Sequence, residues 1–155
     1  MIGLGGAGKA VLSGLRAKIK TGRIYVTNRT ARDELSFWIE GSECVTWIPW
    51  SERHNVLRAV KTVINCTILG GALRPFESPI DWSQIDHLTP GLVAFDVNYD
   101  PAVSQFLVGA KSRDLSIVNG MAMNQLQAVY GFYSATRQIA SDVTESEIFD
   151  LMAIS

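Results

Sequence analysis

The sequence has little of what marks several large classes of protein. Only two of its 155 residues are cysteine, and the formal net charge is −1. No run of residues approaches the roughly 20 apolar positions that a membrane-spanning helix needs. A nearly neutral chain also has no electrostatic reason to bind nucleic acid or an anionic membrane. We therefore expect neither nucleic acid nor a membrane as a partner.

The sequence also lacks the signs of an oxidising compartment and of a metal site. Residues 3–8 are rich in glycine, which interrupts any apolar core of a secretory signal. Cys44 and Cys66 lie in short apolar runs, so we expect buried, reduced thiols in a cytoplasmic protein, with a disulfide or a metal pair as the alternative. His54 and His87 have no ligand-like spacing to these cysteines, and we expect no metal site.

What is present is the composition of one globular domain, 47% hydrophobic and 19% charged. Short apolar runs, bounded by Gly, Pro, Asp or Asn, predict the strands Ile24–Thr27, Cys44–Ile48, Thr62–Cys66, Leu92–Val97 and Ser116–Val118. Segments between and after them predict the helices Gly8–Lys20, Ala31–Ile39, Arg53–Val60, Val103–Ser112, Met121–Gln138 and Glu145–Ala153. This alternation predicts an α/β fold over residues 1–155: a Rossmann-type, doubly wound, mostly parallel sheet with helices on both faces.

Two stretches depart from the regular alternation. Residues 69–90 are rich in proline and predict a long irregular loop with a short helical turn near Asp81–Ile85, and such loops are often functional. At the start of the chain, the glycine-rich turn follows Met1 within a residue. We therefore expect a truncated first strand, and a chain that is a fragment of a longer protein.

The glycine-rich turn predicts a phosphate-binding loop. Gly3, Gly5 and Gly8 form a G-x-G-x-x-G pattern that opens an amphipathic helix, and a strand follows about twenty residues later. In this pattern the glycines permit a tight turn, close approach of a pyrophosphate, and close packing of helix on strand. The amides at the helix start, around Gly6 and Ala7, then receive the diphosphate. An ordinary structural turn is the alternative.

The residues after the second predicted strand favour NADP over NAD. NAD-binding domains usually carry an Asp or Glu there, which hydrogen-bonds the ribose hydroxyls. This chain instead has Asn28, Arg29 and Thr30, followed by Arg32. A guanidinium can bind a 2′-phosphate in two-pronged fashion, whereas a carboxylate would repel it. The alternative is a solvated loop with ordinary charges.

With these motifs in place, nearly the whole chain resembles the C-terminal domain of the shikimate dehydrogenase family. Five segments carry the resemblance, in the family's order: Gly5–Ala10, Asn28–Thr30, Ile64–Gly70, Asp96–Pro101 and Gly120–Ala128. They resemble the family patterns G-G-A-[AGS]-[KR]-A, N-R-T, I-N-[AC]-T-x-x-G, D-x-x-Y-x-P and G-x-x-M-x-x-x-Q-A. One departure is that the family often spaces its second phosphate-binding arginine one residue later than Arg32.

The resemblance implies roles for residues at the carboxyl edge of the sheet, where open α/β sheets bind ligands. Asn65, Thr67, Gly120 and Met123 would contact the nicotinamide end of NADP (NADPH), and a thioether can pack against that ring. Tyr99 and Gln127 would contact the shikimate-type substrate. Without the family context, each residue has a structural alternative: Met123 could belong to the core, Tyr99 could shape a turn, and Gln127 could be solvated.

The resemblance further implies an NADP-dependent oxidoreductase that reversibly reduces 3-dehydroshikimate to shikimate, in aromatic amino acid and chorismate biosynthesis. In the family a Lys–Asp pair of the N-terminal substrate domain assists the hydride transfer. We expect that domain, and with it every catalytic residue, to be absent, and the chain to be inactive alone. An apolar face on the helix Glu145–Ala153 predicts a homodimer.

Three alternatives remain open at this stage. The first is quinate instead of shikimate as the substrate. The second is the nucleotide-binding domain of glutamyl-tRNA reductase, which fits the first 70 residues and also has N-R-T after its second strand. The third is a non-catalytic NADP-binding module that senses redox state.

Overall fold

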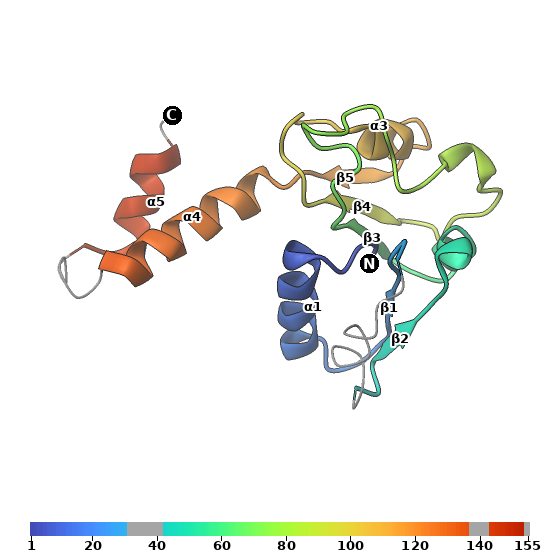
Figure 1. Cartoon of the computed structure of the whole chain (residues 1–155), viewed down its shortest axis with the longest axis horizontal. Helices are drawn as coiled ribbons and strands as arrows, with labels where there is room; N and C mark the ends of the chain where they lie inside the picture. Colours follow the sequence, from blue (N-terminus) through green and yellow to red (C-terminus); the bar gives the residue numbers. More distant parts are fainter. Residues whose placement is uncertain (31–41, 137–142, 154–155) are drawn as a thin grey trace. The chain divides into compact units, whose positions relative to one another are not determined.

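The structure, a computed structural model, describes residues 1–30, 42–136 and 143–153. It divides into two units, Met1–Asn119 and Gly120–Ser155, each of which is described by itself (Figure 1). The predicted helix Ala31–Ile39 lies outside the described residues. The first unit holds the sheet, and the second holds two helices.

All five predicted strands are present in the first unit, each within its predicted range. They are β1 (Ile24–Val26), β2 (Val45–Trp47), β3 (Thr62–Asn65), β4 (Val93–Asp96) and β5 (Ser116–Val118). Strand β1 pairs with β2, β3 with β4, and β4 with β5, and every pair is parallel. The prediction of a parallel sheet is confirmed.

The first three residues of the chain join these strands into one sheet. Ile2 forms parallel bridges to Thr27 on one side and to Asn65 on the other. Its amide donates to the carbonyl of Ile64 at 2.8 Å, and its carbonyl accepts from the amide of Cys66 at 2.8 Å. The resulting order is β2, β1, Ile2, β3, β4, β5, which is the strand order of the doubly wound dinucleotide-binding fold.

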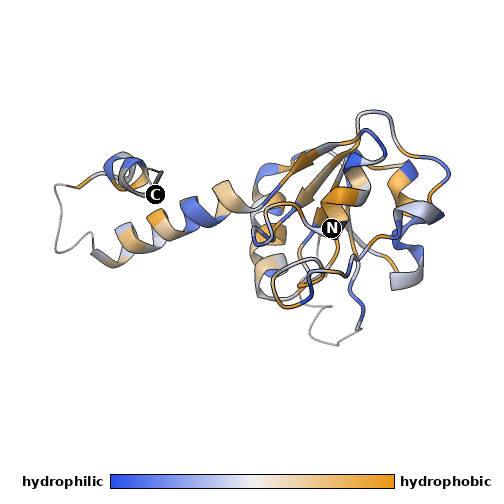
Figure 2. Ribbon diagram, turned by 90° about the horizontal axis from the view of Figure 1, so that it is seen from above, coloured by the Kyte–Doolittle hydropathy of each residue, from blue (hydrophilic) through white to orange (hydrophobic). Residues whose placement is uncertain are grey.

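Helices cover both faces of this sheet. Side chains alternate across each strand, so apolar strands present apolar side chains on both faces, and each face packs against a helix. Helix α1 (Gly6–Lys18) places Leu12 in one apolar cluster with Ile24 and Val26. Helix α3 (Gln105–Lys111) places its buried apolar side chains in a second cluster, which contains Ile2, Val63, Ala94, Phe106 and Leu107. In Figure 2 the strands of the sheet are coloured largely as hydrophobic.

The segment 53–60 differs from its predicted helix. Two short 3₁₀ turns, η1 (Trp50–Arg53) and η2 (Asn55–Arg58), take its place. The side chain of Arg53 bonds the carbonyl oxygens of Trp50 and Pro79, which ties the first turn to a distant loop. Of the two turns only Leu57 is buried, so a regular helix would gain little apolar contact here. In the long irregular loop, the expected helical turn is η3 (Trp82–Gln84).

The second unit consists of α4 (Met121–Thr136) and α5 (Glu145–Ala153), which pack against each other. The start of α5 is a reciprocal capping box. The amide of Glu147 donates to the Thr144 hydroxyl, and the Glu147 carboxylate accepts from the Thr144 amide at 2.8 Å. Because the amide and the hydroxyl of Thr144 both donate to the Glu147 carboxylate, the pKa of Glu147 lies below its ordinary value.

Candidate functional site

The glycine-rich turn is as tight as the sequence predicts. Gly3 has a φ of +95°, and a Cβ added to it would lie 2.8 Å from Cγ2 of Thr67. A Cβ on Gly8 would lie 2.3 Å from the carbonyl oxygen of Gly3. Glycine is therefore required at both positions, at the first by conformation and at both by space.

The first turn of α1 is open and uncapped, which suits an anion. Gly5 is the N-cap residue, and it has no side chain that could cap the free amides that follow it. No acidic residue occupies the first turn. A Cβ added to Gly5 or Gly6 would meet nothing within 4 Å, so a ligand can approach the backbone closely there. Free amides at the positive end of a helix, in open space, are the donor set that a diphosphate requires.

The segment after β1 borders the same space. Arg29 and Thr30 are exposed. The side chain of Asn28 bonds neighbouring backbone: its Oδ1 accepts from the backbone amide of Leu4 at 3.2 Å, and its Nδ2 donates to the backbone carbonyl of Thr30 at 2.7 Å. Asn28 thus ties the glycine turn to the segment that carries Arg29. Arg32, predicted as a second phosphate contact, lies outside the described residues.

Asn65, at the end of β3, is a fully bonded buried residue. Its carbonyl oxygen accepts from the amide and the hydroxyl of Thr67 at 2.9 and 2.7 Å. Its side-chain amide donates to the carbonyl of Leu69 at 2.9 Å and to the Asp96 carboxylate at 3.1 Å. Asn65 therefore shapes the turn that follows it, whereas Thr67 lies half-buried at the surface of that turn.

Asp96, which the sequence argument passed over, lies at the centre of this network. Its carboxylate also accepts from the amide and the side chain of Asn98, at 3.0 and 2.8 Å, and from the hydroxyl of Ser104. Burial raises the pKa of Asp96, although the hydrogen bonds oppose that shift. The sequence could have indicated this role, because Asp96 ends an apolar strand. A carboxylate buried there without hydrogen-bond partners would be costly, so partners are expected around it.

A cavity of about 210 Å³ opens between these segments at the carboxyl edge of the sheet. Among the predicted residues, it is lined by Gly3, Gly5, Asn28, Arg29, Thr30 and Thr67. The structure adds Trp50, Cys66, Ile68 and Leu69, which the sequence argument did not single out. Predicted residues from three separate segments are thus brought together around one cavity.

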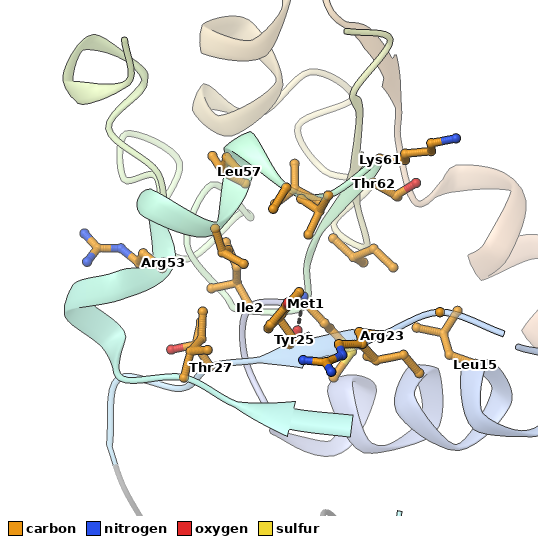
Figure 3. A pocket seen from close by; sticks show the side chains of 18 of the residues that line it. Met1, Ile2, Leu15, Arg23, Tyr25, Thr27, Arg53, Leu57, Lys61 and Thr62 are labelled. Atoms are coloured by element: carbon orange, nitrogen blue, oxygen red, sulfur yellow. Dashed lines mark hydrogen bonds between the residues drawn. The ribbon is translucent and has the colours of Figure 1, made fainter. Parts of the chain in front are cut away.

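A larger cavity of about 540 Å³ lies at the other, amino-terminal edge of the strands, between β1 and β3 (Figure 3). There the amino group of Met1 donates to the carbonyl of Tyr25 at 2.7 Å, and burial lowers the pKa of that amino group to about 6. From α1 (Gly6–Lys18) the lining of this cavity takes Leu15, which lies beyond the first turn of that helix. Parallel sheets bind their ligands at the carboxyl edge, so the smaller cavity is the candidate site.

The remaining predicted residues lie apart from that cavity or in the second unit. Tyr99 follows β4 and is 43% exposed, and it does not line the cavity. Gly120, Met123 and Gln127 belong to the second unit, where Met123 is half-buried and Gln127 is exposed. Their contacts with cofactor or substrate stay predictions.

Two further features concern the described part of the chain. Within residues 1–30, 42–136 and 143–153, no helix is long and apolar enough to cross a membrane. In the same ranges, no group of three His, Cys, Asp or Glu side chains is placed to hold a metal ion. Cys44 and Cys66 are free thiols, and burial raises the pKa of the Cys66 thiol to about 12.

Comparison with known proteins finds relatives whose names include NADP(+). No protein-family model matches the chain. Curated relatives named shikimate dehydrogenase (NADP(+)) do match it, over 79% to 95% of its length. The one from Ruegeria sp. is 35% identical over 136 residues, which are 85% of this chain and 46% of that protein. The chain thus spans about half the length of the curated relatives it matches.

Solved structures show the same fold. The shikimate 5-dehydrogenase from Listeria monocytogenes, in complex with shikimate and NAD, superposes with a TM-score of 0.76 at 20% identity, over 97% of this chain and 54% of that one. The quinate dehydrogenase from Corynebacterium glutamicum, in complex with NAD, gives 0.71 at 23% identity, over 99% and 54%. By its sequence relatives, the chain belongs to the shikimate dehydrogenase family, and it shares the Rossmann-type fold of these solved structures.

Proposed function

We propose that this chain is the NADP-binding part of an NADP-dependent shikimate dehydrogenase, an enzyme that reversibly reduces 3-dehydroshikimate to shikimate. The observation that carries the proposal is the cavity at the carboxyl edge, where the glycine turn before α1 and the Arg29–Thr30 segment meet. The printed names of the sequence relatives, shikimate dehydrogenase (NADP(+)), support the same cofactor and substrate.

In this proposal the diphosphate lies against the start of α1. The amides of Gly5, Gly6 and Ala7 receive its oxygens, and Gly3 shapes the turn that exposes them. The support is threefold: an uncapped helix end, a first turn without acidic residues, and open space over Gly5 and Gly6. Each of these lowers the free energy of an anion at the site.

The adenosine 2′-phosphate is proposed to bind at the segment after β1. Arg29 supplies the charge and Thr30 a hydroxyl donor, and both line the cavity with Asn28. Arg32 is proposed to assist them. Positions 28 to 30 hold no carboxylate, so none of these three residues repels a second negative charge on the ribose.

The nicotinamide end is proposed to bind near Thr67, with Gly120 and Met123 as further contacts. When bound, NADP supplies the hydride chemistry. Asn65 contributes by holding Thr67 in place, because its side-chain carbonyl oxygen accepts from both the amide and the hydroxyl of Thr67. Tyr99 and Gln127 are proposed as substrate contacts.

The relatives favour this proposal over a glutamyl-tRNA reductase-like domain. That alternative accounts only for the first 70 residues, whereas the similarity to the relatives covers 79% to 95% of the chain.

We further propose that the 155-residue polypeptide alone binds NADP without turning over shikimate. Free thiols at both cysteines are consistent with the cytoplasm, where we place the protein. A homodimer is also proposed, and light scattering of the purified chain tests it.

Calorimetric titration with NADP and NAD tests the cofactor proposal. Wild type is expected to bind NADP more tightly than NAD. Arg29→Ala is expected to lose about ten- to a hundredfold in NADP affinity, because a charged hydrogen bond to phosphate contributes about 1.5–3 kcal/mol. The affinity for NAD, which lacks the 2′-phosphate, is expected to change little. Arg23→Ala is the matched control, since Arg23 is also exposed but lines the cavity at the opposite edge.

Equal affinities of wild type for the two cofactors, unchanged by Arg29→Ala, would remove the case for NADP. Failure to bind either cofactor would remove the case for a dinucleotide site. For the activity, shikimate-dependent NADP reduction by the isolated chain would refute the proposed division between cofactor binding and catalysis.

A further inference from the structure

Trp50 lines the carboxyl-edge cavity, although it belongs to none of the motifs that predicted the site. It begins η1, just after β2, and so reaches the cavity from a different part of the chain than the glycine turn. In the lining it joins Asn28, Arg29 and Thr30 from the segment after β1. Because β2 pairs with β1 in parallel and Trp47 lies opposite Val26, Trp50 follows β2 at the same sheet edge as residues 28–30, where the adenosine half of the cofactor is proposed to bind.

Arg53 covers one face of the Trp50 ring, which leaves the other face for a ligand. Its guanidinium carbon lies 4.4 Å from the centroid of the Trp50 ring, which is cation–π geometry. The same guanidinium donates to the carbonyl of Trp50 at 2.8 Å and to that of Pro79 at 2.7 Å. Arg53 lines the larger cavity at the opposite edge, as Figure 3 shows, so it does not compete for space in the smaller one. Ring and backbone of Trp50 are thus fixed before any ligand arrives.

A fixed, half-buried indole is a good stacking surface for a nucleobase. Stacking on an aromatic side chain stabilises a bound base, because every base has a π-face that such a ring can contact. Ordering Trp50 costs little on binding, because Arg53 already restrains it. Ile68 and Leu69 also line the cavity, and their apolar side chains offer no hydrogen bonds that would compete with those of a ligand.

We propose that Trp50 is the adenine-binding surface of the dinucleotide site and that Arg53 is its positioning residue. The proposal rests on the proposed function, since it takes an adenine dinucleotide as the ligand. It deepens that function by assigning the base, in addition to the phosphates, to a named side chain of this chain.

The test combines calorimetry with tryptophan fluorescence on the full chain. The probes are NADP, adenosine 2′,5′-bisphosphate, which retains the base, and nicotinamide mononucleotide, which lacks it. Trp50→Ala is expected to weaken both adenine-containing probes about tenfold, and to leave nicotinamide mononucleotide unchanged. Trp50→Phe keeps an aromatic surface and is expected to retain most of the affinity. Trp47→Phe is the matched control, because it removes an indole that does not line the cavity.

Fluorescence distinguishes a bound base from a structural effect. Adenosine 2′,5′-bisphosphate is expected to quench the emission of wild type and of Trp47→Phe, and to lose that quenching in Trp50→Phe. Arg53→Leu is expected to weaken the same probe by a smaller factor, while the far-ultraviolet circular dichroism stays that of wild type.

The outcomes separate the two proposals. If wild type binds NADP, but Trp50→Phe keeps full quenching or Trp50→Ala keeps full affinity, the role of Trp50 is refuted and the cofactor site stands. If wild type binds neither NADP nor the bisphosphate, the proposed function fails, and this inference fails with it. Should Trp50→Ala not fold, the quenching of Trp50→Phe decides.

Discussion

Gly8 lies so close to Gly3 that a Cβ on Gly8 would stand 2.3 Å from the Gly3 carbonyl oxygen. Gly8→Ala must therefore push the helix start away from the glycine turn. Overpacking of this kind costs about 1–3 kcal/mol, and we expect such a loss in the free energy of unfolding, together with weaker NADP binding. Urea denaturation and calorimetric titration measure the two effects.

Gly14→Ala is the control for this prediction. Gly14 lies in the same helix, is exposed, and would meet nothing within 4 Å if it carried a Cβ. Alanine is favoured over glycine within a helix by about 0.5–1 kcal/mol, so this variant should gain stability and keep its affinity. A Gly8→Ala variant as stable as wild type would contradict the close packing of turn and helix.

Asp96 holds together three side chains that shape the site. Asp96→Ala would leave the amides of Asn65 and Asn98 and the hydroxyl of Ser104 without this acceptor. We expect a loss of about 2–4 kcal/mol in the free energy of unfolding, because unsatisfied buried donors are costly. Asp86→Ala, at an exposed position, should stay within about 0.5 kcal/mol of wild type. Equal effects of the two substitutions in urea denaturation would contradict the network.

The same carboxyl makes stability depend on pH. Its pKa is raised above the ordinary value of 3.8, chiefly by burial. Between 3.8 and the raised value, the folded state binds more protons than the unfolded state, so the contribution of Asp96 to stability falls as the pH rises through that window. Subtracting the unfolding free energy of Asp96→Asn from that of wild type, from about pH 3 upward, isolates this contribution. A difference that rises with pH would show a lowered pKa instead.

The two cysteines should react at different rates. Burial raises the pKa of Cys66 to about 12, and the thiolate is the reactive form, whereas Cys44 is partly exposed. Iodoacetamide at about pH 8 is therefore expected to modify Cys44 first. Mass spectrometry of wild type, Cys44→Ser and Cys66→Ser assigns the sites. Modification of Cys66 at the same rate would mean that the turn around it opens readily.

The pattern of apolar and polar residues along short stretches of the sequence predicted much of the fold and part of the site. The five strands, α1 and α5 follow from short apolar runs and helical spacing, which depend on neighbours in sequence. The segment 53–60 did not follow, because the bonds of Arg53 to Trp50 and Pro79 form only after distant loops meet. The same holds for the role of Asp96, whose partners come from β3 and from the start of α3.

By itself, the sequence of this protein determined a parallel α/β sheet, a glycine turn before a helix, and a guanidinium where NAD-binding domains carry an acid. Spacing and residue type suffice for these, since each concerns a few adjacent residues. Only the tertiary structure decided that Asn65 shapes a turn, that Asp96 is buried beneath it, and that Trp50 joins Arg29 at one cavity. Those relations depend on which strands become neighbours, because a sheet brings together the ends of strands that lie far apart in the chain.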